Sequence, residues 1–263
     1  MKKILFTFSL LAFLSCSSDE PNNNEIDNAD DDVTPSCTSV VEDYITVGSQ
    51  IWAVNNLDVT TYCDGTEIPQ VESDVNNYDA WTNLKTGAWT YAKNCNCGAS
   101  YTYSESELHS FGKLYNWYAV AGIHDEDPNT PNKKLSPDGW LVPTSEDFNI
   151  LFSNNSSPSL RTTGSTDDGS GLWIVRVQSG AELGTNTTGF SALPAGFKSR
   201  FGNANGNGGY GSAGYYQYFW TSDLIQNNKA NNVVITTFPS PNDFETQENY
   251  LTTGLSVRLI KSQ

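Results

Sequence analysis

The chain has 263 residues and a formal net charge of −16 at neutral pH, from 30 acidic and 14 basic residues. A surface this acidic repels phosphate groups, which argues against a nucleic-acid partner and against docking on anionic lipid headgroups. Beyond residue 36 there are 12 basic and 23 acidic residues, which leaves a net charge of −11. This part is long enough to bury a sizeable core as one domain.

The N-terminus has the pattern of a bacterial lipoprotein signal peptide. Two lysines precede the apolar run Ile4–Leu14, which is too short to cross a hydrocarbon layer of about 30 Å. The run ends at Ser15-Cys16, a small residue before a cysteine, and this resembles a lipobox. We therefore predict a signal peptide over residues 1–15 and acylation of Cys16, with about 0.8 kcal/mol of anchoring per buried CH₂. The alternative is an ordinary secretory peptide with Cys16 in a disulfide.

Residues 16–36 are predicted to form the lipidated cysteine and a disordered acidic tether. Ser17–Ser36 holds seven acidic residues, no basic residue and almost no apolar surface, so ordering this segment is not offset by burial. Acidic residues directly after the acylated cysteine also resemble the signal that sends lipoproteins of the Bacteroidota to the outer leaflet. We predict a surface-exposed protein of the cell outer membrane, anchored in its lipid through Cys16. A plain solvated spacer is the alternative.

Four further cysteines follow: Cys37, Cys63, Cys95 and Cys97. An even number in an oxidising compartment predicts two disulfides, for which three connectivities exist. A bridge between Cys95 and Cys97 would be strained, which favours two longer-range bridges. Zinc binding is the alternative, although the Cys-x-Cys spacing lacks the usual two-residue gap.

The predicted elements begin with a hairpin. Tyr44–Val47 and Gln50–Val54 are apolar runs on either side of a two-residue turn. A short helix is then predicted from the spacing of Leu114, Trp117, Tyr118 and Ala121.

A second helix is predicted to begin after Pro143. Thr144 and Asp147 have the spacing of a capping box, and the acidic side chain favours the positive helix start. Its apolar stripe consists of Phe148, Leu151 and Phe152.

The last third of the chain is strand-like. The predicted strands are Gly189–Leu193, Tyr218–Ser222, Asn232–Thr237 and Leu255–Ile260. Polar or glycine-rich loops are predicted at residues 125–132, 153–171 and 203–214. Few helices, many short strands and long loops indicate an α+β fold.

A series of blocks in a fixed order resembles one protein family. The blocks are Gln50–Leu57, Tyr62–Pro69, Ala80-Trp81, Thr86–Trp89, Phe111–Val120, Ser136–Thr144, Thr188–Phe197, Tyr218–Ser222 and Gly254–Lys261. They cover nearly all of the chain from Tyr44 to Lys261. Residues 37–263 are therefore identified as a member of the Fibrobacter succinogenes major paralogous domain family.

That family resembles C-type-lectin-like folds, including the domain of formylglycine-generating enzymes. The resemblance implies a loop-rich, twisted antiparallel sheet core with a few short flanking helices. Gly139–Phe148 is similar to the strand-to-helix entry of that fold, and Gly254–Ile260 to its closing strand. Ser136 and Leu259 stand where family members often carry cysteines, so this chain must do without the bridge that such a pair implies.

The sequence gives little support for catalysis, and fold analogy does not supply it. His109 and His124 are the only imidazoles, lie in no metal-spaced motif and are expected on exposed loops. Formylglycine-type copper chemistry needs a cysteine pair late in the domain, and the last cysteine is Cys97. Carboxylate pairs such as Asp167-Asp168 occur, but no sequence feature identifies one of them as the catalytic pair of a glycosidase. We predict no catalytic residues and no cofactor other than calcium.

Calcium is considered because lectins of this type bind sugar through a calcium-holding loop. Asp125, Asp127 and Asn129 form an oxygen-rich turn, and such hard oxygen ligands suit calcium. Asp127 stands where the lectin loop has a glutamate before the proline. A solvated acidic turn is the alternative interpretation.

Aromatic residues give the last signal. Trp52, Trp117, Trp140 and Trp220 lie in apolar blocks and are predicted to be core. The candidate ligand-binding residues, next to a glycine-rich loop, are Tyr210, Tyr215, Tyr216 and Tyr218. Exposed rings there would stack on sugar faces, whereas the alternative is that alternate rings, such as Tyr216 and Tyr218, pack inward.

The predicted function is that of a noncatalytic surface module that binds glycan or another extracellular polymer. The alternative is a structural or adhesive envelope protein that binds other proteins, none of which the sequence identifies, through its loops.

Overall fold

The structure, a computed structural model, describes residues 37, 40–74, 76–77, 79–94, 101–201, 208–226, 228–238 and 244–262. Pro35–Gln263 is a compact unit. The predicted signal peptide, Cys16 and the acidic tether lie outside the described residues, as do Cys95 and Cys97. Within the described residues, no helix combines the length and the apolar character that crossing a membrane requires.

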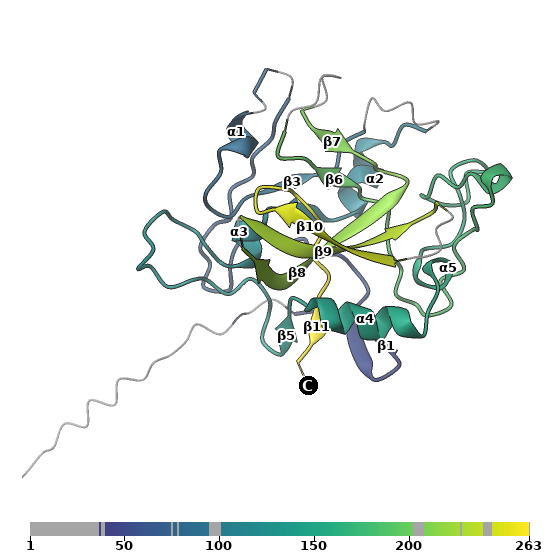
Figure 1. The fold of residues 1–263 in the computed structure, drawn as a ribbon, viewed down its shortest axis with the longest axis horizontal. Helices are drawn as coiled ribbons and strands as arrows, with labels where there is room; N and C mark the ends of the chain where they lie inside the picture. The colour runs from purple at the N-terminus through teal and green to yellow at the C-terminus, as the bar shows by residue number, and fades with distance from the viewer. Residues whose placement is uncertain are drawn as a thin grey trace, which may run out of the picture. The chain divides into compact units, whose positions relative to one another are not determined.

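The domain consists of short strands in small sheets and a few short helices (Figure 1). The strands are β1 (Tyr44–Val47), β2 (Gln50–Ala53), β3 (Trp89–Tyr91), β4 (Lys113–Tyr115), β5 (Trp140–Leu141), β6 (Phe197–Lys198), β7 (Tyr210–Gly211), β8 (Tyr216–Ile225), β9 (Lys229–Thr236), β10 (Phe244–Tyr250) and β11 (Ile260–Lys261). The helices are α1 (Asp79–Thr82), α2 (Glu105–Ser110), α3 (Trp117–Val120), α4 (Ser145–Ser153), α5 (Ser157–Leu160) and the 3₁₀ helix η1 (Val177–Ser179).

The strands form a four-stranded sheet of order β1-β2-β11-β5, a three-stranded sheet of order β10-β9-β8, and the pairs β3-β4 and β6-β7. Every one of these pairs is antiparallel. The segment 254–256 joins the smaller sheets through single bridges of Gly254 to Lys198, Leu255 to Tyr115 and Ser256 to Phe219. This mixture of small antiparallel sheets and short helices confirms the α+β class.

The predicted hairpin and the predicted second helix are confirmed. Val47 pairs with Gln50 across the turn, where Gly48 has a φ of +61° that a residue without Cβ adopts readily. In α4, Thr144 Oγ1 accepts a hydrogen bond from the Asp147 N–H at 3.2 Å, and Asp147 Oδ2 accepts one from the Thr144 N–H at 2.8 Å. Both ends of the capping box are therefore satisfied.

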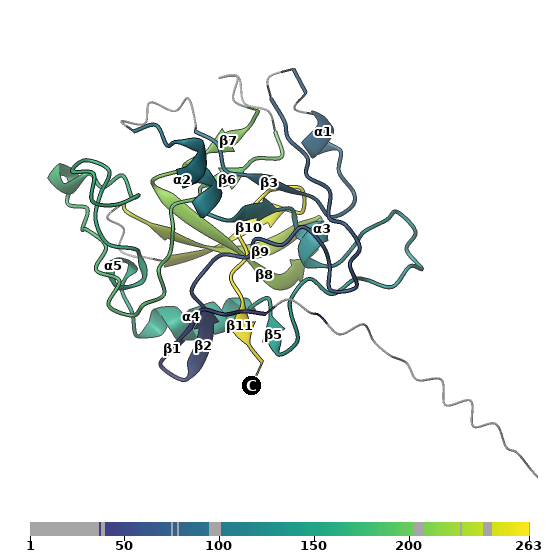
Figure 2. The same cartoon turned by 180° about the vertical axis from the view of Figure 1, so that it is seen from behind.

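Helix α4 covers one face of the three-stranded sheet. Phe148 and Leu151 are buried, and the Phe148 ring lies 5.0 Å from that of Trp52 and 5.7 Å from that of Phe219. Figures 1 and 2 show α4 along the lower edge of the domain, next to the β1–β2 hairpin. The four tryptophans predicted to be core are all buried.

Two predicted elements differ from the structure because local backbone geometry overrides periodicity. Leu114 lies in β4, and α3 starts only at Trp117 because the Asn116 side chain caps it, accepting from the Ala119 N–H at 3.0 Å. Gly189–Leu193 is not a strand, since Gly189 and Ser191 have φ values of +74° and +57°.

Three other regions also need correction. Strand β10 was not predicted because its sequence, Phe-Glu-Thr-Gln-Glu-Asn-Tyr, is mostly polar. The predicted loop at 153–171 contains α5 and the buried Arg161. His109 lies in the last turn of α2, stacked 3.8 Å from the Tyr91 ring, instead of on a loop.

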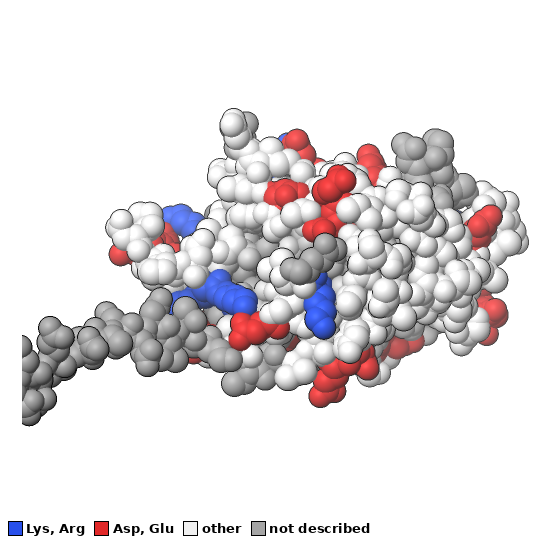
Figure 3. Space-filling model, turned by 90° about the horizontal axis from the view of Figure 1, so that it is seen from below, with Lys and Arg blue, Asp and Glu red and all other residues white. Residues whose placement is uncertain are grey.

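The face below the view of Figure 1 carries separate acidic groups among uncharged atoms, with basic groups close to some of them (Figure 3). Charge is thus distributed over this face in small groups.

Candidate functional site

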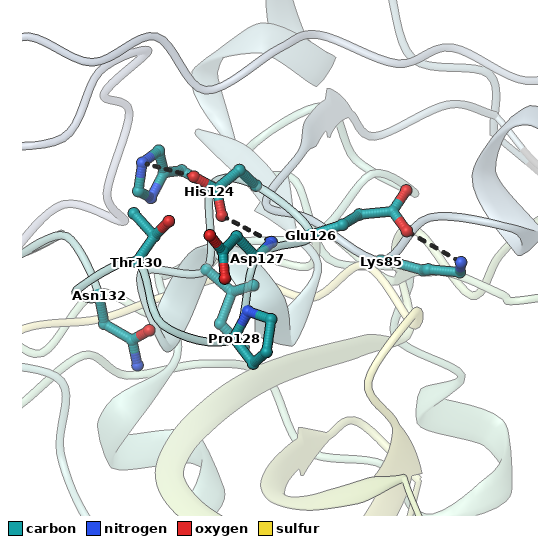
Figure 4. A pocket seen from close by; sticks show the side chains of 9 residues that line it. Lys85, His124, Glu126, Asp127, Pro128, Thr130 and Asn132 are labelled. Atoms are coloured by element: carbon teal, nitrogen blue, oxygen red, sulfur yellow. Dashed lines mark hydrogen bonds and ion pairs between the residues drawn. The ribbon is translucent and has the colours of Figure 1, made fainter.

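Of the predicted calcium residues, Asp125 and Asp127 line a pocket of about 340 Å³, and Asn129 is not among its lining residues. The pocket is also lined by Lys85, His124, Thr130 and Asn132. Glu126 extends toward Lys85, whose Nζ lies 2.9 Å from its carboxylate (Figure 4). The His124 Nε2 atom lies 3.4 Å from Asp125 Oδ2 on the other side of the loop. The loop therefore spreads its acidic side chains over different partners.

The carboxylates of this loop hold its own backbone. Asp125 Oδ1 accepts from the Asp127 N–H at 3.0 Å, and Asp127 Oδ1 accepts from the backbone and side-chain N–H groups of Asn129, both at 2.9 Å. The Asn129 hydrogen bonds lower the pKa of Asp127. Among the described residues, no three His, Cys, Asp or Glu side chains are grouped to hold a metal. A calcium ion here would need most of its six to eight oxygen ligands from backbone and water.

The structure confirms one of the predicted disulfides. Cys37 and Cys63 are bonded, with Cα atoms 4.4 Å apart, and the Cys63 N–H donates to the Lys134 carbonyl at 2.9 Å. Cys63 Sγ lies 3.1 Å from the carbonyl oxygen of Ser136. The bridge thus fixes the start of the domain beside residues 134–136. This bond leaves only Cys95 and Cys97 to pair with each other, so the expectation of two longer-range bridges is wrong. Cys95 and Cys97 themselves lie outside the described residues.

The four tyrosines predicted to bind ligand divide into two pairs. Tyr210 and Tyr215 are only 1 % and 7 % exposed, with their hydroxyls 2.8 Å from Thr90 Oγ1 and 3.2 Å from Arg176 Nη2. These two offer no open ring face, which corrects the expectation of four exposed rings. Tyr216 and Tyr218 are half-buried and lie on one face of β8, because side chains alternate along a strand.

Tyr216 and Tyr218 belong to a continuous set of rings, named here the aromatic row, which consists of Phe197, Tyr218, Tyr216, Phe238 and Tyr215. The Tyr216 ring lies 5.7 Å from that of Tyr218 at an interplanar angle of 23°, and 5.5 Å from that of Phe238 at 32°. Phe238 stacks on Tyr215 at 5.5 Å, and Phe197 meets Tyr218 edge-on at 5.6 Å. Phe238 is 36 % exposed. The middle of the row is therefore an ordered, partly open aromatic surface.

Polar groups lie beside the row on the same sheet face. Tyr218 pairs with Val234, which in turn pairs with Glu245, so the three side chains point to one side. Glu245 is exposed and accepts from Gln247 Nε2 at 2.8 Å. Burial, with smaller contributions from Tyr216 and Glu245, raises the pKa of Tyr218 far above its ordinary value. Its hydroxyl therefore stays a hydrogen-bond donor at physiological pH.

The profile of the Fibrobacter succinogenes major domain family matches residues 45–261, which is most of the chain. The chain belongs to this family. No curated protein and no solved structure shows a significant match. The matched range runs from β1 to β11 and so includes both the aromatic row and the sheet that carries it.

The closing block of the family domain has a structural role at Arg258. Its Nε and Nη2 donate to Asn56 Oδ1 at 3.0 and 2.7 Å, and Nη1 donates to the carbonyls of Ala53 and Phe190 at 3.0 and 2.6 Å. The guanidinium carbon lies 5.3 Å from the Phe219 ring. Burial lowers the pKa of Arg258 to about 9, which leaves it charged at neutral pH. This side chain joins three separate segments of the domain.

Two members of the candidate site were missed from the sequence. Phe238 follows β9 and reaches the row only because the chain turns there, and Glu245 lies on the unpredicted strand β10. A period-two pattern of Glu245, Gln247 and Asn249 was the one available signal for a strand with a polar face.

Proposed function

We propose that this protein is an exported lipoprotein of the outer membrane whose family domain binds glycan without catalysis. The observation that carries the proposal is the aromatic row, in which Tyr216, Tyr218 and Phe238 are near-parallel and partly open. The lipobox at Cys16, the acidic tether and the resemblance to C-type-lectin-like folds support a binding module presented outside the cell.

The row fits the chemistry of a sugar polymer. The faces of pyranose rings are lined with C–H groups, which pack on aromatic faces and remove apolar surface from water. Tyrosine loses little conformational freedom on binding, since it has two side-chain torsions. The Tyr218 hydroxyl and the Glu245 carboxylate then supply a donor and an acceptor for sugar hydroxyls beside the stacked rings.

A noncatalytic role fits the surroundings of Glu245. Its partners are the Gln247 amide and, across the sheet, Val234 and Tyr218. Glycoside hydrolysis uses a pair of carboxylates on opposite sides of the scissile bond. The chemistry gathered at the row is therefore that of recognition.

The test is a glycan array with the full chain carrying Cys16→Ser, which prevents acylation. Each of Tyr216→Ala and Tyr218→Ala is expected to weaken binding at least tenfold, which corresponds to about 1.4 kcal/mol. Tyr44→Ala is the matched control, because Tyr44 is 54 % exposed and lies outside the row. Absence of binding to every glycan, or an equal loss in Tyr44→Ala, overturns the proposal.

The array is repeated with calcium and with a chelator. Binding at the row is expected to survive chelation. Loss of binding on chelation, reproduced by Asp127→Asn, would instead assign recognition to the loop at residues 125–129.

Export is tested separately on the native chain. Mass spectrometry of the N-terminal peptide is expected to find acylated Cys16, and external protease is expected to remove the protein from intact cells. An unmodified Cys16 in a cytosolic protein contradicts this part of the proposal without affecting the binding test.

A further inference from the structure

We propose a second ligand site, for a sugar that carries a carboxylate, at a cluster of exposed rings and cations around Arg200. The Arg200 guanidinium carbon lies 4.1 Å from the ring centre of Tyr250 and 4.6 Å from that of Phe201. The Lys229 Nζ atom lies 5.7 Å from the same Tyr250 ring. Phe201 and Tyr250 are 58 % and 38 % exposed.

This cluster is distinct from the aromatic row. Tyr250 pairs with Lys229 at the start of β9, whereas Tyr216 pairs with Thr236 at its end. Seven residue steps of a strand separate these positions by roughly 20 Å. A ligand of one or two sugar units therefore occupies one site at a time.

Among the described residues, Arg200 differs from most of the lysines in having no carboxylate beside its charged group. In the part of the chain that the structure describes, six lysines have a carboxylate oxygen 2.5–3.2 Å from Nζ: Lys85, Lys93, Lys113, Lys133, Lys134 and Lys229. Among the residues that the structure describes, Arg200 has no carboxylate within 4 Å, and its buried Nε has no hydrogen-bond partner. Stacking on rings occupies the face of a guanidinium and does not satisfy its N–H donors.

A carboxylate is the group that this edge fits. Arginine binds carboxylates through two parallel charge-assisted hydrogen bonds, a geometry that lysine does not offer. The exposed rings of Phe201 and Tyr250 beside it suit the C–H face of a sugar, as in the aromatic row. A uronate unit satisfies both requirements, whereas an acidic peptide satisfies only the first.

A hollow next to the cluster gives room for a neighbouring sugar unit. It has a volume of about 560 Å³ and is lined by Leu224, Ile225, Gln226, Lys229 and Glu248. Glu248 lies 3.2 Å from Lys229, so the ligand carboxylate is expected to bind at Arg200 and its polar hydroxyls at the Lys229–Glu248 pair.

The acidity of the chain does not prevent this binding. At physiological ionic strength the Debye length is about 8 Å, so carboxylates elsewhere on the domain are largely screened. Binding is therefore expected to weaken with added salt, because it depends on one local charge pair.

This inference relies on the proposed function only for the class of ligand, and its test uses different probes and variants. Oligogalacturonate is compared with its methyl ester, which has the same sugar without the charge, on the Cys16→Ser chain. Wild type is expected to bind the acid at least tenfold more tightly than the ester. Arg200→Gln is expected to lose that difference, Tyr250→Leu to weaken binding of both, and Tyr44→Ala, at an exposed tyrosine outside both sites, to leave both unchanged.

Lys261→Gln is the matched control, because Lys261 also lies over an exposed tyrosine, 5.5 Å from the Tyr44 ring. Thermal unfolding of each variant checks that it is folded. No binding of the acid, equal binding of acid and ester, or equally tight binding of polyglutamate overturns the inference. Neutral-glycan binding that depends on Tyr216 would still stand in each case, so the two proposals fail separately.

Discussion

The two faces of the β8-β9-β10 sheet have different chemistry although they are built by alternating residues of the same strands. Toward α4, Phe219, Val233 and Ile235 are fully buried in a core with Phe148. On the opposite face, Tyr216 and Tyr218 are half-buried and lie beside an exposed Glu245. Phe219, Val233 and Ile235 pack into one core cluster, whereas Tyr216 and Tyr218 are only partly buried and Tyr218 packs against another core cluster that contains Trp220.

Two buried cations, Arg258 and Lys198, differ in their hydrogen bonding. Arg258, on the α4 side, donates four hydrogen bonds. Lys198 lies in β6, next to the Phe197 that contacts Tyr218, and its Nζ donates to the Ser199 carbonyl at 2.7 Å. Burial, and to a smaller extent Lys93, lowers the pKa of Lys198 to about 7. Arg258 is thus hydrogen-bonded more completely than Lys198, whose Nζ lies 5.5 Å from the ring centres of Trp81 and Tyr210.

The largest expected effect comes from truncating neighbouring rings on the two faces. Phe219→Ala is expected to lower the free energy of unfolding by about 3–5 kcal/mol, because it opens a cavity in a close-packed core. Tyr218→Ala is expected to cost about half as much, since solvent already reaches that ring. Urea denaturation of both variants measures the difference. Equal losses would show that the open face is also structural.

Arg258→Met is expected to cost about 3 kcal/mol, because the acceptors on Asn56, Ala53 and Phe190 lose their donor while buried. Thermal unfolding is expected to show a midpoint about 6–12 °C lower for a domain of this size. Arg176→Met, at an exposed arginine, serves as the control and is expected to shift the midpoint by less than a third of that. A wild-type midpoint in Arg258→Met would mean that methionine packing compensates for the lost hydrogen bonds.

Lys198 is expected to make stability depend on pH. Its pKa is lower in the folded chain than in the unfolded chain, about 7 against 10.5, so the unfolded state binds more protons between these values. Stability from this group therefore rises as pH increases from 7 toward 10.5, by on the order of 2 kcal/mol or more, and is flat below 7. Denaturation of wild type and Lys198→Met at pH 7 and pH 9.5 isolates the contribution. A rise of equal size in the variant would assign it to other groups.

The smallest effect is expected at the helix that covers the buried face. Thr144→Ala removes the side-chain acceptor at the start of α4 and is expected to cost about 1 kcal/mol. Ser104→Ala at the more exposed helix α2, which has the same capping box, is the matched comparison and is expected to cost less. Urea midpoints of the two variants rank the helices. A larger loss of stability in Ser104→Ala would show that the cap of α2 contributes more than the cap of α4, contrary to this prediction.

Prediction from the sequence succeeded where the structure of a segment is set by residues close to it in the chain. The hairpin at Gly48, the capping box at Thr144 and the buried tryptophans each follow from neighbours within a few residues. It failed for Gly189–Leu193, where positive φ values interrupt the strand, and for β10, whose polar sequence becomes a strand only by pairing with β9. Half of the predicted ligand tyrosines proved buried, since burial depends on distant segments.

The sequence by itself determined the family, the α+β class and the position of the second helix, whereas the partner of Cys37 was decided by the structure. The first three depend on block order, periodicity and composition, which are local properties of the chain. Only the tertiary structure decided which tyrosines are open, that Phe238 and Glu245 join them, and that Arg200 lies between two exposed rings. Such arrangements depend on contacts between segments far apart in the sequence. The residues of one segment do not reveal which distant segment they will contact.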